Sequence, residues 1–136
     1  MDLDPRPLLS VEDLTIEIDG ANVVDGISFT VAPGKVMALV GESGCGKSLT
    51  SYAMLGLLPP AARRSGGNIR LDGRDLTALS EREFRKARGK DISIIFQEPS
   101  ASLDPLTTVG AQIAAAYRTH HKVSRTEAYA KARQML

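Results

Sequence analysis

Apolar residues in this chain of 136 residues fall into runs whose spacing predicts strands. Residues 8–18 partly alternate between apolar and polar side chains, and residues 27–31 form a second run before a Pro-Gly turn. Residues 36–40 are apolar throughout and β-branched at both ends, which is typical of a strand buried inside a parallel sheet. Residues 92–96 predict another buried strand, and residues 68–71 predict a short one.

Helical segments separate these strands. A helix is expected from Gly46 to about Leu57, where two consecutive prolines follow shortly after. Ser80 and Ser124 each precede a glutamate by three residues, a capping box that predicts the start of a helix. Helical spacing between these two boxes is shown by Val109, Ile113 and Tyr117. Strands that alternate with helices predict an α/β fold.

The composition is that of an ordinary soluble globular protein, with 43% apolar and 24% charged residues. The 17 basic and 16 acidic residues nearly cancel, so we expect no nucleic-acid partner. A single cysteine excludes an intramolecular disulfide, in keeping with a reducing, cytosolic setting. No apolar stretch is long enough to cross a bilayer, so we expect no direct membrane insertion.

A glycine-rich stretch between the strand predicted at 36–40 and the helix that follows fits the pattern G-x-x-x-x-G-K-S/T at every fixed position. Its residues are Gly41, Glu42, Ser43, Gly44, Cys45, Gly46, Lys47 and Ser48. Glycines allow several backbone amides to turn toward one anion, and the following helix adds its positive N-terminal end. The pattern predicts a loop that holds the phosphates of a nucleoside triphosphate.

Individual positions of this loop have distinct expected roles. Lys47 supplies a mobile positive charge for the β- and γ-phosphates, and the Ser48 hydroxyl is placed to ligate Mg²⁺. Glu42 lies within the anion cradle and is not expected to act as a catalytic base. Cys45 is expected to fill space rather than to react. The alternative, a turn that only leads a strand into a helix, accounts poorly for the complete motif.

Three further stretches resemble ATP-binding-cassette (ABC) ATPases, and the last of them, together with the glycine-rich loop, is similar to the peptide/nickel importer branch. Residues 8–14 and 24–35 are similar to the opening of these proteins, where a small antiparallel β-subdomain precedes a RecA-like core. Residues 67–76 are similar to the family's G-x-I-x-x-x-G-x-D-L stretch. Residues 92–105 resemble its Q-loop, with Gln97 as the named residue. The resemblance implies a P-loop NTPase core with a parallel sheet, joined to the small antiparallel β-subdomain.

The resemblance also implies ligands and partners. Gln97 would ligate Mg²⁺ beside Ser48, and ATP would be the nucleotide. The segment after Gln97 would contact an integral-membrane permease, and a second ABC ATPase subunit would complete the assembly. A solute-binding protein would act indirectly. The implied location is the cytoplasmic face of the bacterial inner membrane, held there through the permease.

Two departures from the family pattern change the expected activity. The family places an aromatic ring on adenine, whereas the corresponding position here holds Ile18. The sequence also lacks the Leu-Ser-Gly-Gly-Gln-like signature, the Walker B strand with its catalytic glutamate, and the switch histidine. His120 and His121 precede these positions and are interpreted as solvated residues at a helix end. No catalytic residue is therefore assigned within this chain.

These observations leave two functions open. Residues 1–7 are expected to be a flexible lead-in, and residues 8–136 the N-terminal part of an incomplete ABC ATPase domain, because the sequence stops inside a helical pattern. The first function is an ATP-binding subunit that energises an importer for peptides or related solutes. This chain alone is then expected to bind ATP but not to hydrolyse it. The alternative is a truncated, non-catalytic module for nucleotide binding or assembly.

Overall fold

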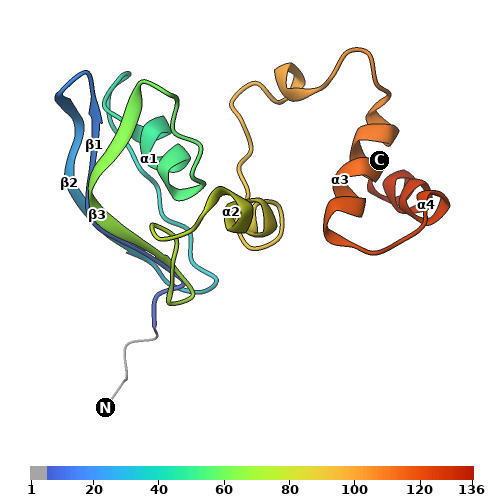
Figure 1. Cartoon of the computed structure of the whole chain (residues 1–136), viewed down its shortest axis with the longest axis horizontal. Helices are drawn as coiled ribbons and strands as arrows, with labels where there is room; N and C mark the ends of the chain where they lie inside the picture. Colours follow the sequence, from blue (N-terminus) through green and yellow to red (C-terminus); the bar gives the residue numbers. More distant parts are fainter. Residues whose placement is uncertain (1–5) are drawn as a thin grey trace. The chain divides into compact units, whose positions relative to one another are not determined.

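The computed structural model describes residues 6–136, and for Ala101 it describes the backbone alone. Most of the predicted lead-in, residues 1–5, lies outside the described residues. The chain divides into two compact units, Met1–Arg85 and Lys86–Leu136 (Figure 1). Helix α2 (Glu81–Ala87) spans the boundary between them.

The first unit is built on a four-stranded antiparallel sheet with the strand order β2-β1-β3-β4 (Figure 1). The strands are β1 (Leu9–Ile18), β2 (Ala21–Val31), β3 (Ala62–Leu71) and β4 (Arg74–Asp75). The predicted antiparallel β-subdomain is therefore confirmed, and its second and third strands are longer than the sequence pattern suggested.

A bulge in β1 explains why its alternation is only partial. Val11, Leu14 and Ile16 are all buried, although a strict period of two would place Val11 and Leu14 on opposite faces. The register against both neighbouring strands shifts after residues 11–12, and Asp13 adopts a φ of +49° there. The extra residue returns the following side chains to the core face.

Helix α1 (Lys47–Met54) packs against this sheet through Ala53, which belongs to the same apolar cluster as Leu14 and Ile16. The helix ends three residues before the predicted Leu57. Gly56 has a φ of +62°, and the Leu57 amide donates to the Tyr52 carbonyl oxygen at 2.8 Å. This is a Schellman stop, so a glycine, and not the later pair of prolines, ends the helix.

The two strands expected in a parallel core sheet do not form in the described part of the chain. Residues 36–40 are irregular, and the side chains of Val36 and Val40 are 98% and 87% exposed. Residues 92–96 have a single parallel bridge, between Ile92 and Arg88, and Ile95 is 89% exposed. Both strand predictions were wrong for this structure, because a strand needs a neighbour along its length and, apart from the one bridge at Ile92, none of the described segments pairs with either run.

The second unit contains the short helix η1 (Pro99–Ser102) and two longer helices, α3 (Val109–His120) and α4 (Arg125–Met135). The two long helices pack together through small side chains, since Ala114, Ala128 and Ala132 are buried against one another. No helix among residues 6–136 has the length and apolar content that a membrane crossing requires.

Both predicted capping boxes begin a helix. At α4 the Ser124 hydroxyl accepts from the Glu127 amide, and the Glu127 carboxylate accepts from the Ser124 amide at 2.9 Å, as predicted. At α2 the Glu83 carboxylate likewise accepts from the Ser80 amide, at 2.8 Å. The Ser80 hydroxyl differs from the prediction, because it donates to that carboxylate while the Glu83 amide donates to the Ser80 carbonyl oxygen.

Candidate phosphate-binding site

The glycine-rich loop, residues 41–48, lies entirely in the first unit and leads directly into α1. Gly46 is the residue before the helix and has a φ of +88°, and Gly44 has a φ of +85°. This left-handed backbone region is costly for residues that carry a β-carbon. The glycine positions of the motif are therefore required by the shape of the loop.

Strand β2 packs directly against the loop at Gly46. A β-carbon on Gly46 would lie 2.5 Å from Val24 Cγ2 and 2.9 Å from the Val23 carbonyl oxygen. On the helix side, the buried Thr50 hydroxyl donates to the Gly46 carbonyl oxygen at 3.0 Å. These three supporting residues were missed in the sequence analysis. Thr50 stands two positions after the motif, but the two valines adjoin the loop only through the fold.

Several backbone amides of the loop lack a hydrogen-bond partner among the described residues. They include the amides of Gly44, Gly46, Lys47 and Ser48, at the start of α1. Gly46 provides no side-chain cap, and the first turn of α1 carries no acidic residue. The N-terminal end of a helix therefore presents free donors and a partial positive charge to the loop, which is the arrangement that an anion requires.

The Lys47 side chain folds back over the loop. Its ammonium group donates to the carbonyl oxygens of Gly41, at 2.7 Å, and Glu42, and it lies 3.3 Å from Cys45 Sγ. The positive charge is thus held at the loop by neutral acceptors, with no carboxylate in these contacts. Ser48 is exposed, and its hydroxyl has no partner among the described residues.

Close contacts within the loop explain the small residues at its start. A β-carbon on Gly41 would lie 2.6 Å from Cys45 Sγ, so the thiol occupies the space beside that glycine. Cys45 and Glu42 are both exposed. Glu42 uses its backbone carbonyl, and not its carboxylate, in the contact with Lys47.

Ile18, the candidate adenine contact, is the last residue of β1 and lies in the same unit as the loop. It pairs with Ala21 of β2 and with Ala62 of β3 and is half-buried against the apolar cluster of the sheet. Its remaining exposed surface is aliphatic, and its contact with adenine remains a prediction.

Gln97, the candidate Mg²⁺ ligand, belongs to the second unit, where it occupies an exposed bend just before η1. The loop at residues 41–48 and Gln97 are thus contributed by different units, and their joint use as a metal site remains a prediction.

The segment after Gln97 is tied to the first turn of α3. Gln112 donates from its side-chain amide to the carbonyl oxygens of Asp104 and Thr107, at 3.0 and 2.8 Å, and accepts from the Asp104 amide at 3.0 Å. The Thr107 hydroxyl and then the Leu106 amide donate to the Asp104 carboxylate and lower its pKa. Leu106 is 94% exposed on this ordered segment.

Comparison with known proteins identifies the family of the chain. The model of the ABC transporter family matches residues 24–136, which include the whole glycine-rich loop and Gln97. The chain belongs to the ABC transporter family. The glycine-rich loop and Gln97 both lie within the residues that match the family, and their individual roles remain proposals.

Curated relatives match the ABC chain over nearly its whole length. It is 47% identical to the probable peptide ABC transporter ATP-binding protein y4tR of Sinorhizobium fredii, over 95% of this chain and 40% of the relative. It is 44% identical to the dipeptide transport ATP-binding protein DppD of Bacillus subtilis, again over 95% of this chain and 40% of the relative. The chain thus spans less than half the length of these relatives.

Solved structures of ABC proteins share the fold. The cbiO1 protein of Clostridium perfringens, part of the ABC transporter complex cbiONQ, aligns with a TM-score of 0.68 and 26% identity over 92% of this chain and 47% of that one. The ATP-binding cassette MJ0796, solved as a dimer bound to ADP and Pi, aligns with a TM-score of 0.75 over 93% of this chain and 54% of that one. Its identity is 18%, so it supports the fold alone.

Proposed function

We propose that this chain binds ATP with Mg²⁺ and forms the ATP-binding part of a subunit that energises the import of peptides or related solutes. The observation that carries the proposal is the set of free backbone amides at Gly44, Gly46, Lys47 and Ser48, at the N-terminal end of α1. Membership of the ABC transporter family, together with relatives whose names specify peptide and dipeptide transport, supports the wider role.

The phosphates would lie in the loop at residues 41–48. Free amides donate to the phosphate oxygens, and the Lys47 ammonium exchanges its two carbonyl acceptors for the β- and γ-phosphates. Such an exchange replaces neutral acceptors by charged ones, and hydrogen bonds between ionised groups are roughly twice as strong as neutral pairs. Ile18 would pack on the adenine through its exposed aliphatic surface.

The residues available for Mg²⁺ fit a hard cation. The Ser48 hydroxyl is exposed and unpartnered among the described residues, and Gln97 offers an exposed amide carbonyl. Mg²⁺ prefers such oxygen ligands and is usually held by one or two protein groups together with substrate phosphates. A bound Mg²⁺ would neutralise charge between the β- and γ-phosphates, and these two side chains would hold it there.

The segment after Gln97 supports a membrane partner. It is held in shape by Gln112, and it exposes Leu103 and Leu106. We propose that this segment contacts an integral-membrane permease, with a second ABC ATPase subunit in the assembly and a solute-binding protein acting indirectly. The chain would then work at the cytoplasmic face of the bacterial inner membrane.

The test separates binding from hydrolysis in the 136-residue chain. Calorimetric titration with Mg-ATP is expected to give one site per chain, while a phosphate-release assay over the same period gives no turnover, because no residue of this sequence is assigned to activate water. Absence of Mg-ATP binding would contradict the proposal. Steady phosphate release that Lys47→Ala abolishes would show that the binding assignment is right and that the non-catalytic assignment is wrong.

A further inference from the structure

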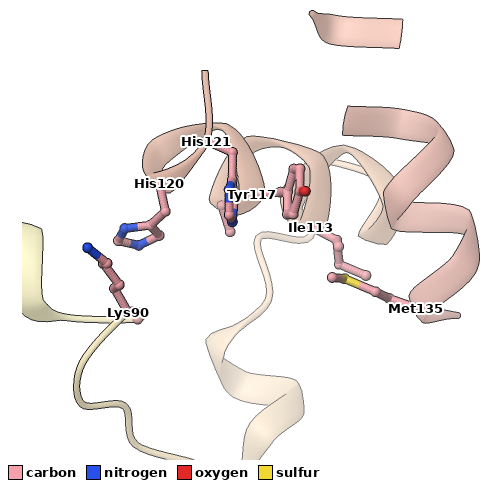
Figure 2. Close-up of a pocket in the computed structure, with 8 residues that line it drawn as sticks. Lys90, Ile113, Tyr117, His120, His121 and Met135 are labelled. Carbon is pink, nitrogen blue, oxygen red and sulfur yellow. The ribbon is translucent and has the colours of Figure 1, made fainter. Parts of the chain in front are cut away.

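A cavity of about 540 Å³ opens on α3 within the second unit (Figure 2). Its walls come from the turn after α2, from one side of α3 and from the end of α4. The labelled residues are Lys90, Ile113, Tyr117, His120, His121 and Met135. The volume lies within the range of roughly 300–1,000 Å³ that small-molecule sites occupy. None of these residues takes part in the proposed ATP site.

One end of the cavity is basic. Figure 2 shows the Lys90 ammonium facing the His120 ring, and no acidic side chain lines the cavity. Among the described residues, neither side chain has a hydrogen-bond or ion-pair partner. His120 was expected to be solvated, but it is half-buried, with Nε2 only 2.9 Å from a β-carbon built on Gly89. An unpaired ammonium group beside an imidazole that can also donate, with no carboxylate in the lining, favours an anion at this end.

The rest of the cavity is apolar and aromatic. The rings of Tyr117 and His121 stack with their centroids 4.2 Å apart and their planes inclined by 22°. Ile113 of α3 and Met135 of α4 provide aliphatic and thioether surface at the other end (Figure 2). Flat aromatic groups gain from offset or edge contacts with such rings and from contact with methionine sulfur.

We propose that this cavity binds a small amphipathic anion, with its carboxylate or sulfonate group at Lys90 and His120 and a flat apolar body against Tyr117, Ile113 and Met135. The separation of charge and apolar surface within one cavity carries the inference. A neutral compound of the same shape loses the contact with the ammonium group, and a simple inorganic anion loses the apolar contact.

The test uses 1-naphthoate as the probe and 1-naphthylmethanol as its neutral counterpart. Amide chemical shifts of the full chain are followed by NMR with Mg-ATP in excess, so that ATP competes with the probe for the glycine-rich loop at residues 41–48. We expect 1-naphthoate to shift the amides of Lys90, Tyr117, His120 and Met135 saturably, and the neutral compound to bind about tenfold more weakly.

Two variants distinguish binding in the cavity from nonspecific electrostatic binding to the chain. Lys90 is exposed, so Lys90→Gln is expected to keep the fold, and its NMR spectrum verifies this. The variant is expected to bind 1-naphthoate about tenfold more weakly. Lys122→Gln removes an equal charge from an exposed position outside the cavity, and its affinity for 1-naphthoate is expected to equal that of the unchanged chain. The proposal is overturned if 1-naphthoate leaves the cavity amides unmoved, or if Lys90→Gln binds it as tightly as the unchanged chain.

Discussion

Val24 lies directly against Gly46, so closely that a β-carbon on this glycine would come within 2.5 Å of Val24 Cγ2. Gly46→Ala therefore combines a clash with a strained φ of +88° and is expected to destabilise the first unit by roughly 1–3 kcal/mol. Urea unfolding measures this change. Gly110→Ala is the matched control, because a β-carbon there meets nothing within 4 Å and α3 gains helix propensity. Equal stability of the two variants would contradict the support assigned to Val24.

Local features of this fold could be predicted from the sequence. The Ser124–Glu127 capping box spans four residues, and the turns of the loop at residues 41–48 are formed by its own Gly44 and Gly46, which adopt positive φ. Both depend on neighbours in the chain, and sequence patterns report such neighbours well.

The apolar pattern alone could not predict which distant segments pair, although the family resemblance implied an antiparallel subdomain. Residues 36–40 have the composition of a buried strand, but composition does not supply the second strand whose hydrogen bonds would hold them. The support of Gly46 by Val24 is likewise invisible in sequence, since 22 positions of chain separate the two residues. The β1 bulge at Asp13 was hidden for a similar reason, because register is a property of paired strands.

The candidate adenine contact makes a separate prediction. Ile18→Tyr is expected to strengthen the binding of Mg-ATP by roughly 1–3 kcal/mol, because the tyrosine ring can stack on the adenine base. Binding of Mg-tripolyphosphate, which lacks the base, should stay unchanged. Calorimetric titration of both ligands with both proteins measures the difference. An equal change for the two ligands would place Ile18 away from adenine.

The start of α4 should respond to acid. The hydroxyl and then the amide of Ser124 donate to the Glu127 carboxylate and lower its pKa below the ordinary 4.5. Because the folded pKa is depressed, this contribution to stability is present above the unfolded pKa and is lost as the pH falls through the folded one. Carboxyl NMR titration is expected to give a midpoint below 4.5, which moves upward in Ser124→Ala. A midpoint at or above 4.5 in the unchanged chain would contradict the capping contact.

Exposed apolar side chains predict self-association of the chain. Val36, Ile95 and Leu106 are each about nine-tenths or more exposed, at 98%, 89% and 94%. The backbone of residues 36–40 is also unpaired among the described residues, which makes it a template for strand pairing. Sedimentation velocity is expected to show species larger than the 14.6 kDa monomer. Val36→Lys should reduce them, and Thr126→Lys, which adds the same charge at an exposed polar position, should not. A monodisperse monomer would refute the prediction.

The most direct test follows the free amides of the loop during a titration with Mg-ATP. NMR is expected to show saturable shifts at Gly44, Gly46, Lys47 and Ser48, with one ATP per chain. Lys47→Ala should weaken binding at least about tenfold, because it removes the ammonium group that would exchange the two carbonyl oxygens for phosphate oxygens. Lys35→Ala, at an exposed position outside the loop, should bind as the unchanged chain does. Unmoved loop amides, or equal affinities for the unchanged chain and Lys47→Ala, would contradict the phosphate-binding role of residues 41–48.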